Sequence, residues 1–198
     1  MFARTLALVA ALALAAPATA QRQSLGYQFL EGIKKRDGAA VNKVVSQPGI
    51  GSAVIDYQAN GEAAIHLLAR AGDLQYLAFV LGQGADPDLR NAKGDTPLTI
   101  AVDANQGAAI DLLVKRKAKL EYGNRSGETP LIRAVQNRNL ELASQLLKLG
   151  ANPDTRDIIA GKSARDYATA DNRSPQLAKL LAGAPKVTKK AVSGPQLR

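Results

Sequence analysis

Residue types that perform chemistry are scarce in this chain, which excludes several classes of function. His66 is the only histidine among 198 residues, and there is no cysteine. One imidazole cannot form a multi-histidine metal site, and without thiols there is no disulfide framework, thiolate zinc site or cysteine nucleophile. Neither a G-x-S-x-G segment nor a phosphate-binding glycine loop occurs. We therefore expect no enzyme activity, no catalytic residue, no cofactor and no metal ion.

Acidic side chains are scattered along the chain. Two pairs lie close together, in turns expected to follow helices: Asp86 with Asp88, and Asn152 with Asp154. In such turns Asp and Asn side chains accept hydrogen bonds from local backbone N–H groups, so we expect a structural role. Asp95 and Glu128 each precede a Thr-Pro pair. They either contact a partner or favour the positive end of the helix that follows.

Basic residues gather in three places, and the formal net charge is +9. The clusters are Lys34-Lys35-Arg36, Lys115-Arg116-Lys117 with Lys119, and a C-terminal segment with Lys186, Lys189, Lys190 and Arg198. Aromatic residues make up only 4% of the chain, so stacking on nucleic acid is not expected. The clusters either form solvated faces or bind an anionic polymer or, weakly, an anionic membrane surface.

The N-terminus has the pattern of a secretory signal peptide, predicted over residues 1–20. Arg4 precedes an uninterrupted apolar stretch from Leu6 to Ala16, and Ala18-Thr19-Ala20 supplies the small residues of a cleavage site before Gln21. We expect a periplasmic or secreted, soluble protein, because no later apolar stretch is long enough to span a bilayer. Residues 183–198 have no periodic apolar pattern, so a disordered basic tail is expected.

Between these ends the sequence repeats itself with a period of 33 residues. Gly94-Asp95-Thr96-Pro97-Leu98 recurs 33 positions later as Gly127-Glu128-Thr129-Pro130-Leu131. Weaker copies begin at Gly61 and Gly161. Leu81–Asp88 likewise matches Leu147–Asp154, two periods apart. Two independent motifs in the same phase predict a repeat protein.

Each repeat predicts two short helices. Thr96 and Thr129 are favourable N-cap residues, and a proline follows each at the first helical position. Small Ala101 and Ala134 lie on the buried face and allow close packing of neighbouring repeats. A second amphipathic helix follows in each repeat, with apolar faces at Leu74, Leu77, Val80 and Leu81, at Ile110, Leu113 and Val114, and at Leu142, Leu146 and Leu147. Helices this short are unstable alone, so they must be stabilised by stacking.

These motifs resemble the T-P-L-H-x-A signature of the ankyrin-repeat family. The resemblance implies an all-α solenoid of about five helix-turn-helix repeats joined by β-turn fingers. A divergent N-terminal capping repeat and a long finger would occupy residues 21–59, and ankyrin repeats with a C-terminal cap residues 60–182. His66 falls at the signature histidine, which implies a hydrogen bond to the turn between repeats.

Two departures from the repeat lead to further predictions. Lys117 stands where the neighbouring repeats have Gly84 and Gly150. A left-handed conformation costs a non-glycine residue about 1–2 kcal/mol, so a looser turn is predicted after this helix. Residues 48–58 are predicted to form a finger about three residues longer than usual.

The resemblance also implies where a partner would bind, because such solenoids use finger tips and inner-helix positions on a concave face. The finger-tip candidates are Arg90, Lys93, Asp95, Tyr122, Arg125 and Glu128. The exposed inner-helix candidates are Leu67, Arg70, Ile100, Asp103, Arg133 and Gln136. Tyr122 beside Arg125 is predicted as the centre of the interface, unless Tyr122 packs on a neighbouring finger. We therefore predict a monomeric, non-catalytic module that binds another envelope protein; electrostatic binding to an anionic envelope surface or polymer is the alternative.

Overall fold

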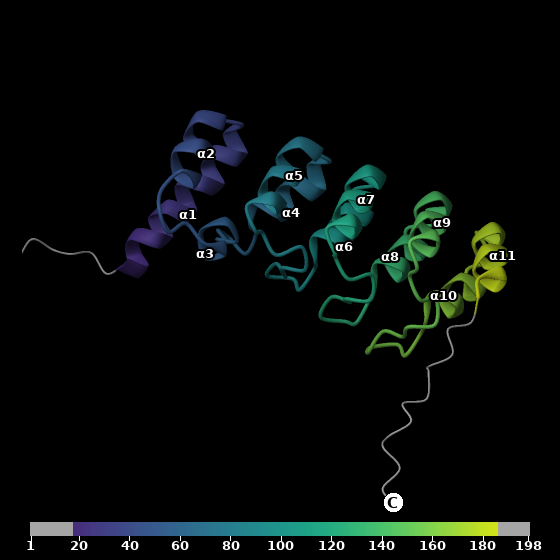
Figure 1. Cartoon of the computed structure of the whole chain (residues 1–198). Helices are drawn as coiled ribbons and strands as arrows, with labels where there is room; N and C mark the ends of the chain where they lie inside the picture. Colours follow the sequence, from purple (N-terminus) through teal and green to yellow (C-terminus); the bar gives the residue numbers. More distant parts are fainter. Residues whose placement is uncertain (1–17, 186–198) are drawn as a thin grey trace, which may run out of the picture.

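The chain folds into a row of stacked helix pairs. The computed structural model describes residues 18–185, with side chains described from residue 25 onward. The helices are α1 (Ala18–Lys35), α2 (Gly38–Val45), α3 (Ser52–Ile55), α4 (Ala64–Ala71), α5 (Leu74–Gly82), α6 (Pro97–Asp103), α7 (Gly107–Lys115), α8 (Pro130–Gln136), α9 (Leu140–Lys148), α10 (Ala164–Ala170) and α11 (Pro175–Gly183). Figure 1 shows five pairs side by side, from α1–α2 to α10–α11. Within the described residues β-structure is limited to two isolated bridges, so the predicted all-α solenoid is confirmed.

Side-chain caps fix where the inner helices begin. Thr96 and Thr129 accept hydrogen bonds through Oγ1 from the N–H groups of Thr99 and Ile132, each at 3.3 Å. A proline occupies the first turn of both helices, where its missing N–H removes no intrahelical bond. The sequence prediction of these two helix starts is therefore confirmed.

Stacking supplies the core. α4, α6, α8 and α10 pack in one row, and the outer helices α5, α7, α9 and α11 form a second row. Ala101, Ala134 and Ala168 are each 0% exposed, since their small side chains let neighbouring inner helices approach closely. Leu74 is an exception among the predicted apolar faces, being 41% exposed at the start of α5. From α4 onward no helix exceeds nine residues, so contact between repeats must stabilise each one.

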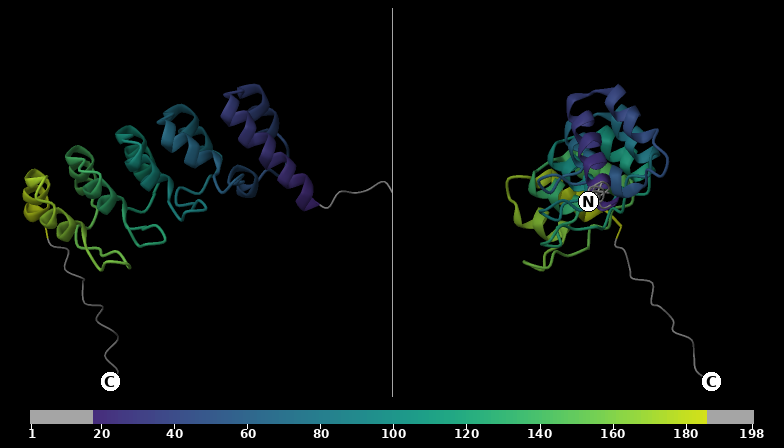
Figure 2. Two further views of the ribbon diagram at one scale, coloured as in Figure 1. Left: turned by 180° about the vertical axis from the view of Figure 1, so that it is seen from behind. Right: turned by 90° about the vertical axis from the view of Figure 1, so that its left-hand side faces the viewer.

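The loops between pairs form four fingers, defined by their tips at residues 59–62, 91–95, 124–128 and 157–162. Figure 2 shows the fingers projecting to the same side of the row. Backbone hydrogen bonds join some neighbouring tips. The Ala92 N–H of the second finger donates to the Gly61 carbonyl of the first at 2.9 Å. The Ile158 N–H donates to the Ser126 carbonyl at the same distance. Backbone bonds therefore join the first finger to the second and the third to the fourth, and Arg125 of the third finger packs against Gly94 of the second.

The predicted looser turn after α7 is wrong. Lys117 adopts the left-handed conformation with φ +73°, like Gly84 at +93° and Gly150 at +100°. Its turn makes the same bonds as theirs: the Lys117 N–H donates to Val114 at 2.9 Å, and the Ala118 N–H donates to Leu113 at 3.0 Å. Side chains at the two glycine positions would meet open space. No steric clash therefore opposes a side chain here, and the bonds that close the helix outweigh the backbone preference.

The N-terminal part also differs from expectation. The long connection predicted over residues 48–58 contains the four-residue helix α3, which packs against α1 and buries Val54 and Ile55. α1 begins at Ala18, before the predicted cleavage position. The rest of the predicted signal peptide and residues 186–198 of the predicted tail lie outside the described residues. No helix among the described residues is long and apolar enough to cross a membrane.

Candidate functional site

One polar side chain shapes the tip in each of the last three fingers. Asn91 accepts hydrogen bonds through Oδ1 from the N–H groups of Lys93 and Asp95, both at 2.9 Å. Asn124 accepts equivalent bonds in the third finger, at 2.9 and 3.1 Å. Asp157 takes this position in the fourth finger. These three residues were not predicted from the sequence, although their spacing of 33 is visible there.

Asp157 holds the fourth finger with the most bonds. Its Oδ1 accepts from the N–H groups of Ile159, Ala160 and Gly161 at 3.0, 2.6 and 3.2 Å. Its Oδ2 accepts from the Tyr167 hydroxyl at 2.8 Å. Burial acts to raise the pKa of Asp157, but these hydrogen bonds outweigh it and lower the pKa below its ordinary value. A charged carboxylate therefore fixes this loop in one shape.

The fixed loop presents two apolar side chains to water. Ile158 and Ile159 are 73% and 77% exposed. The equivalent tips carry Ala92-Lys93 in the second finger and Arg125-Ser126 in the third. Neither isoleucine was predicted from the sequence as a binding residue, although an Ile-Ile pair inside a predicted turn indicates one. Apolar side chains held in water by a rigid loop are suited to contact with another molecule.

Five of the twelve predicted inner-helix and finger residues meet in a hollow between the first two fingers and the inner helices. Its volume is about 290 Å³. It is lined by Glu62, Arg70, Asn91, Lys93, Asp95, Ile100, Asp103 and Ala104. Ile100, predicted to be exposed, is only 5% exposed, because it lies in the wall of this hollow. We call the hollow and the polar side chains beside it, Glu128, Arg133 and Gln136, the concave face.

Ion pairs and hydrogen bonds connect these side chains. Arg70 of α4 donates to both carboxylate oxygens of Glu62 in the first finger. This bond lowers the pKa of Glu62 despite partial burial. Arg133 of α8 donates to Asp103 of α6 at 2.9 and 3.1 Å, which joins two repeats. The inner-helix polar residues therefore bind one another within this chain.

Glu128 also has partners within the chain. It accepts from the side-chain amides of Asn124 at 2.9 Å and Gln136 at 2.8 Å, and Arg133 lies 3.5 Å away. These contacts hold the third finger against α8. Asp95, its counterpart in the second finger, lines the hollow instead.

Tyr122 lies between two cations at the base of the third finger. The Lys119 Nζ atom donates to the Tyr122 hydroxyl at 2.7 Å and lies 4.3 Å from the ring centre. The Arg90 guanidinium, from the second finger, lies 5.5 Å from the same ring centre. Arg125 packs elsewhere, since a side chain on Gly94 would lie 2.6 Å from its Cγ atom. Tyr122 therefore packs against the neighbouring finger, which is the alternative that the sequence left open.

His66 is fully buried and both of its ring nitrogens are used. Nδ1 accepts from the Ala63 N–H at 3.0 Å, so Nε2 carries the proton and donates to the Leu89 carbonyl at 2.9 Å. Burial lowers the pKa of His66, which keeps the ring neutral. The hydrogen bond to the next connecting loop is the one that the resemblance implied. Within residues 25–185 no group of three or more His, Asp or Glu residues is arranged to hold a metal ion.

Known proteins match this architecture. A family model described as ankyrin repeats in three copies matches residues 49–157. The chain is 33% identical over 116 residues to the human SH3 and multiple ankyrin repeat domains protein 2, covering 59% of this chain and 6% of that protein. It is 32% identical over 127 residues to the Mus musculus B-cell lymphoma 3 protein homolog, covering 62% of this chain and 28% of that protein.

A third relative is the Danio rerio neurogenic locus notch homolog protein 1, 33% identical over 113 residues, covering 57% of this chain and 5% of that protein. The matched region therefore spans less than a third of each of these relatives. What they share with this chain is the stacked repeat, which is generally a non-catalytic protein–protein interaction module. The period, the capped helix pairs, the fingers and the matched family model together show that this chain belongs to the ankyrin-repeat family.

Proposed function

We propose that this chain is a non-catalytic, monomeric module that binds a partner protein through its fingers and concave face, with the fourth finger as the apolar anchor. One observation carries the proposal: Ile158 and Ile159 are 73% and 77% exposed on a loop that Asp157 holds in place. Because the loop is already ordered, little conformational entropy is lost when a partner covers it.

The two parts of the surface make different contributions. Full burial of an isoleucine side chain contributes about 1.5–3 kcal/mol, so covering both exposed side chains gives roughly 2–4 kcal/mol. Most polar side chains of the concave face already have partners within the chain, such as Asp103 with Arg133. A bound protein must match or replace those bonds, which favours a complementary partner over others.

The proposal includes a location in the periplasm or outside the cell. It is supported by the apolar stretch Leu6–Ala16 and the Ala18-x-Ala20 site. Mass spectrometry of the protein purified from fractionated bacteria tests it. A chain that begins at Gln21 in the periplasmic fraction is expected, and a chain that keeps Met1 in the cytoplasm contradicts the location alone.

Site-specific photo-crosslinking tests the binding surface. A benzoylphenylalanine in place of Ile159 is expected to capture one protein reproducibly in cells. The same amino acid at Asn172, an exposed residue in the turn between α10 and α11, is the matched control and is expected to capture none. Replacing Ile158 with serine should abolish the adduct formed from position 159, while circular dichroism confirms the fold. Equal adducts from both positions, or an adduct that survives Ile158→Ser, would refute the proposed anchor.

A further inference from the structure

The end of α7 carries cations that nothing in the described structure neutralises. Lys115, Arg116 and Lys117 are all exposed, and none of them forms an ion pair with the side chains described in residues 25–185. The equivalent positions after α5 are Gly82-Gln83-Gly84, and those after α9 are Lys148-Leu149-Gly150. This repeat therefore has three positive charges at these positions, whereas the preceding repeat has none and the following repeat has one.

The other basic cluster of the folded part is different. Lys34 lies 3.0 Å and Lys35 3.9 Å from Glu31, and Arg36 lies 2.7 Å from Asp73. Acidic residues of the same chain therefore compensate the cluster at the end of α1. The two clusters look alike in sequence, and only the structure distinguishes them.

The uncompensated cluster has a structural cost. Cations at the end of a helix do interact favourably with its dipole, but α5 ends without one. Adjacent like charges repel one another, and Lys117 also occupies a left-handed position that a glycine would adopt without strain. The neighbouring repeats have glycine at this position, although non-glycine residues adopt the left-handed conformation elsewhere in the described chain, at Arg36, Asn60, Asn105 and Arg138.

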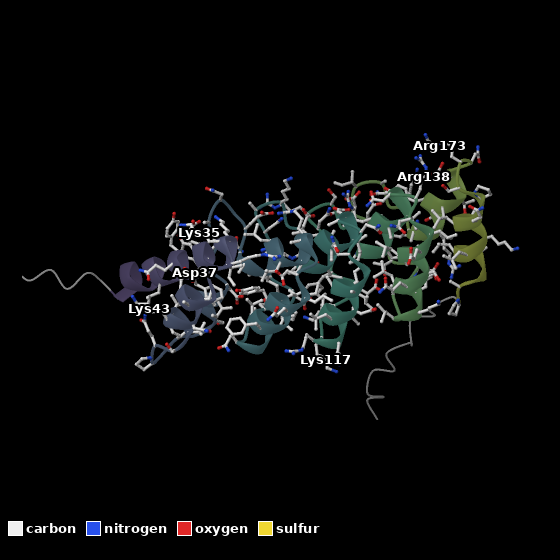
Figure 3. All side chains as sticks on the ribbon, turned by 90° about the horizontal axis from the view of Figure 1, so that it is seen from above. Lys35, Asp37, Lys43, Lys117, Arg138 and Arg173 are labelled. Atoms are coloured by element: carbon white, nitrogen blue, oxygen red, sulfur yellow. The ribbon has the colours of Figure 1, made fainter. Side chains whose placement is uncertain are left out.

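The surface already binds one carboxylate. Asp88 of the preceding repeat accepts a hydrogen bond from the Lys119 N–H at 2.8 Å and lies 3.7 Å from the Lys119 Nζ atom. Arg90 lies beside this pair through its contact with the Tyr122 ring. We call the set Lys115, Arg116, Lys117, Lys119 and Arg90 the α7 basic surface. Figure 3 shows Lys117 at one long edge of the molecule, opposite the edge that carries Arg138 and Arg173.

We infer that the α7 basic surface binds a carboxylate-rich segment of the partner protein; the inference rests on the proposed function and adds the chemistry of the partner. The charge favours an anion, and the geometry favours a polypeptide over a phosphate or a nucleic acid. The N–H groups of residues 116–119 already donate to Leu112, Leu113, Val114 and Asp88, so no backbone nest is free for a phosphate. Because Lys119 and Arg90 lie against the Tyr122 ring, that ring is poorly placed to stack on a nucleic-acid base.

Fluorescence anisotropy with labelled dodeca-glutamate tests the inference on the full chain. One variant carries Lys115→Gln, Arg116→Gln and Lys117→Gln. The matched control carries Lys34→Gln, Lys35→Gln and Arg36→Gln, which removes the same charge and leaves the basic residues beyond position 185 unchanged. We expect the α7 variant to bind about tenfold more weakly, because each exposed ion pair contributes about 0.2–1 kcal/mol. The control should stay within about twofold, since its cations already have partners.

The outcomes separate this inference from the proposed anchor. Equal losses in both variants would mean that overall charge governs binding, and the inference would be wrong. No binding by the unmodified chain at about 50 mM salt, where screening is weak, would also overturn it. Heparin and phosphatidylglycerol vesicles serve as further probes: a loss specific to the α7 variant with either of them, and not with dodeca-glutamate, would assign another class of ligand. None of these results changes what is expected from crosslinking at Ile159.

Discussion

Replacing Lys117 with glycine should stabilise the protein. Lys117 has φ +73° in a turn whose hydrogen bonds are the same as those of Gly84 and Gly150. Glycine adopts this conformation without the penalty of about 1–2 kcal/mol that a side chain incurs. It also makes the unfolded chain more flexible, which costs about 0.4–1 kcal/mol. The net expected gain is therefore about 0.5–1 kcal/mol.

Urea unfolding followed by far-ultraviolet circular dichroism measures this gain. For an m-value of about 2 kcal/mol/M, the midpoint should rise by about 0.3–0.5 M with the slope unchanged. Lys117→Gln is the control, because it removes the same charge and keeps the side chain in the left-handed conformation.

Two results would refute the reasoning. If the glycine variant is no more stable than the original chain, the left-handed conformation carries no measurable strain. If the glutamine variant gains as much, the relief comes from reduced repulsion with Lys115, Arg116 and Lys119 and not from the backbone. The glycine variant should also bind dodeca-glutamate a few-fold more weakly, so stability and binding should change in opposite directions.

Three further changes test the fold. Burial lowers the pKa of His66, so as the pH falls the unfolded chain binds a proton before the folded chain does; the free energy of unfolding should be constant above about pH 6.5 and fall below it, by up to about 1.4 kcal/mol per pH unit. His66→Gln removes the only histidine and should flatten this slope in urea titrations, and an unchanged slope would contradict the prediction. Asp157→Ala should cost about 2–4 kcal/mol by thermal unfolding, whereas Asp157→Asn, which keeps an acceptor as in Asn91 and Asn124, should cost less. Gly127→Ala would place a Cβ atom 2.8 Å from the Ile158 nitrogen and should cost at least about 1 kcal/mol more than Gly84→Ala, which meets open space; equal costs would mean that the fingers do not support one another.

Local chemistry explains which features could be predicted from the sequence. The caps at Thr96 and Thr129 need only a residue and its own helix, so their spacing predicted them. His66 could be placed by its resemblance to a signature. Lys117 was predicted wrongly, because backbone preference alone was considered. The hydrogen bonds of Ala118 and the stacking of the helix outweigh a cost of about 1–2 kcal/mol.

Features that depend on neighbouring repeats were less accessible. The contact of Arg90 with the Tyr122 ring joins residues of two fingers. The sequence of either finger alone does not determine the position of one finger relative to the other. The ion pair of Arg36 with Asp73 likewise depends on packing between the first two helix pairs, whereas that of Lys34 with Glu31 is local to α1. The sequence therefore located both basic clusters but could not tell a neutralised cluster from an uncompensated one.

A repeat protein contains its own control for separating function from structure. Each position has equivalents 33 or 34 residues away that meet nearly the same structural requirements. A residue that differs from its equivalents and lowers stability or solubility therefore needs an explanation other than folding. Lys117 departs from glycine at a strained turn, and Ile158 and Ile159 replace residues such as Lys93 at an exposed tip. Neither departure improves stacking, since the Lys117 side chain is exposed to solvent and the two isoleucines lie at a finger tip outside the core. Substituting these residues by their equivalents from neighbouring repeats should therefore preserve or improve stability while weakening binding. Changing a core residue such as Leu131 should instead lower stability.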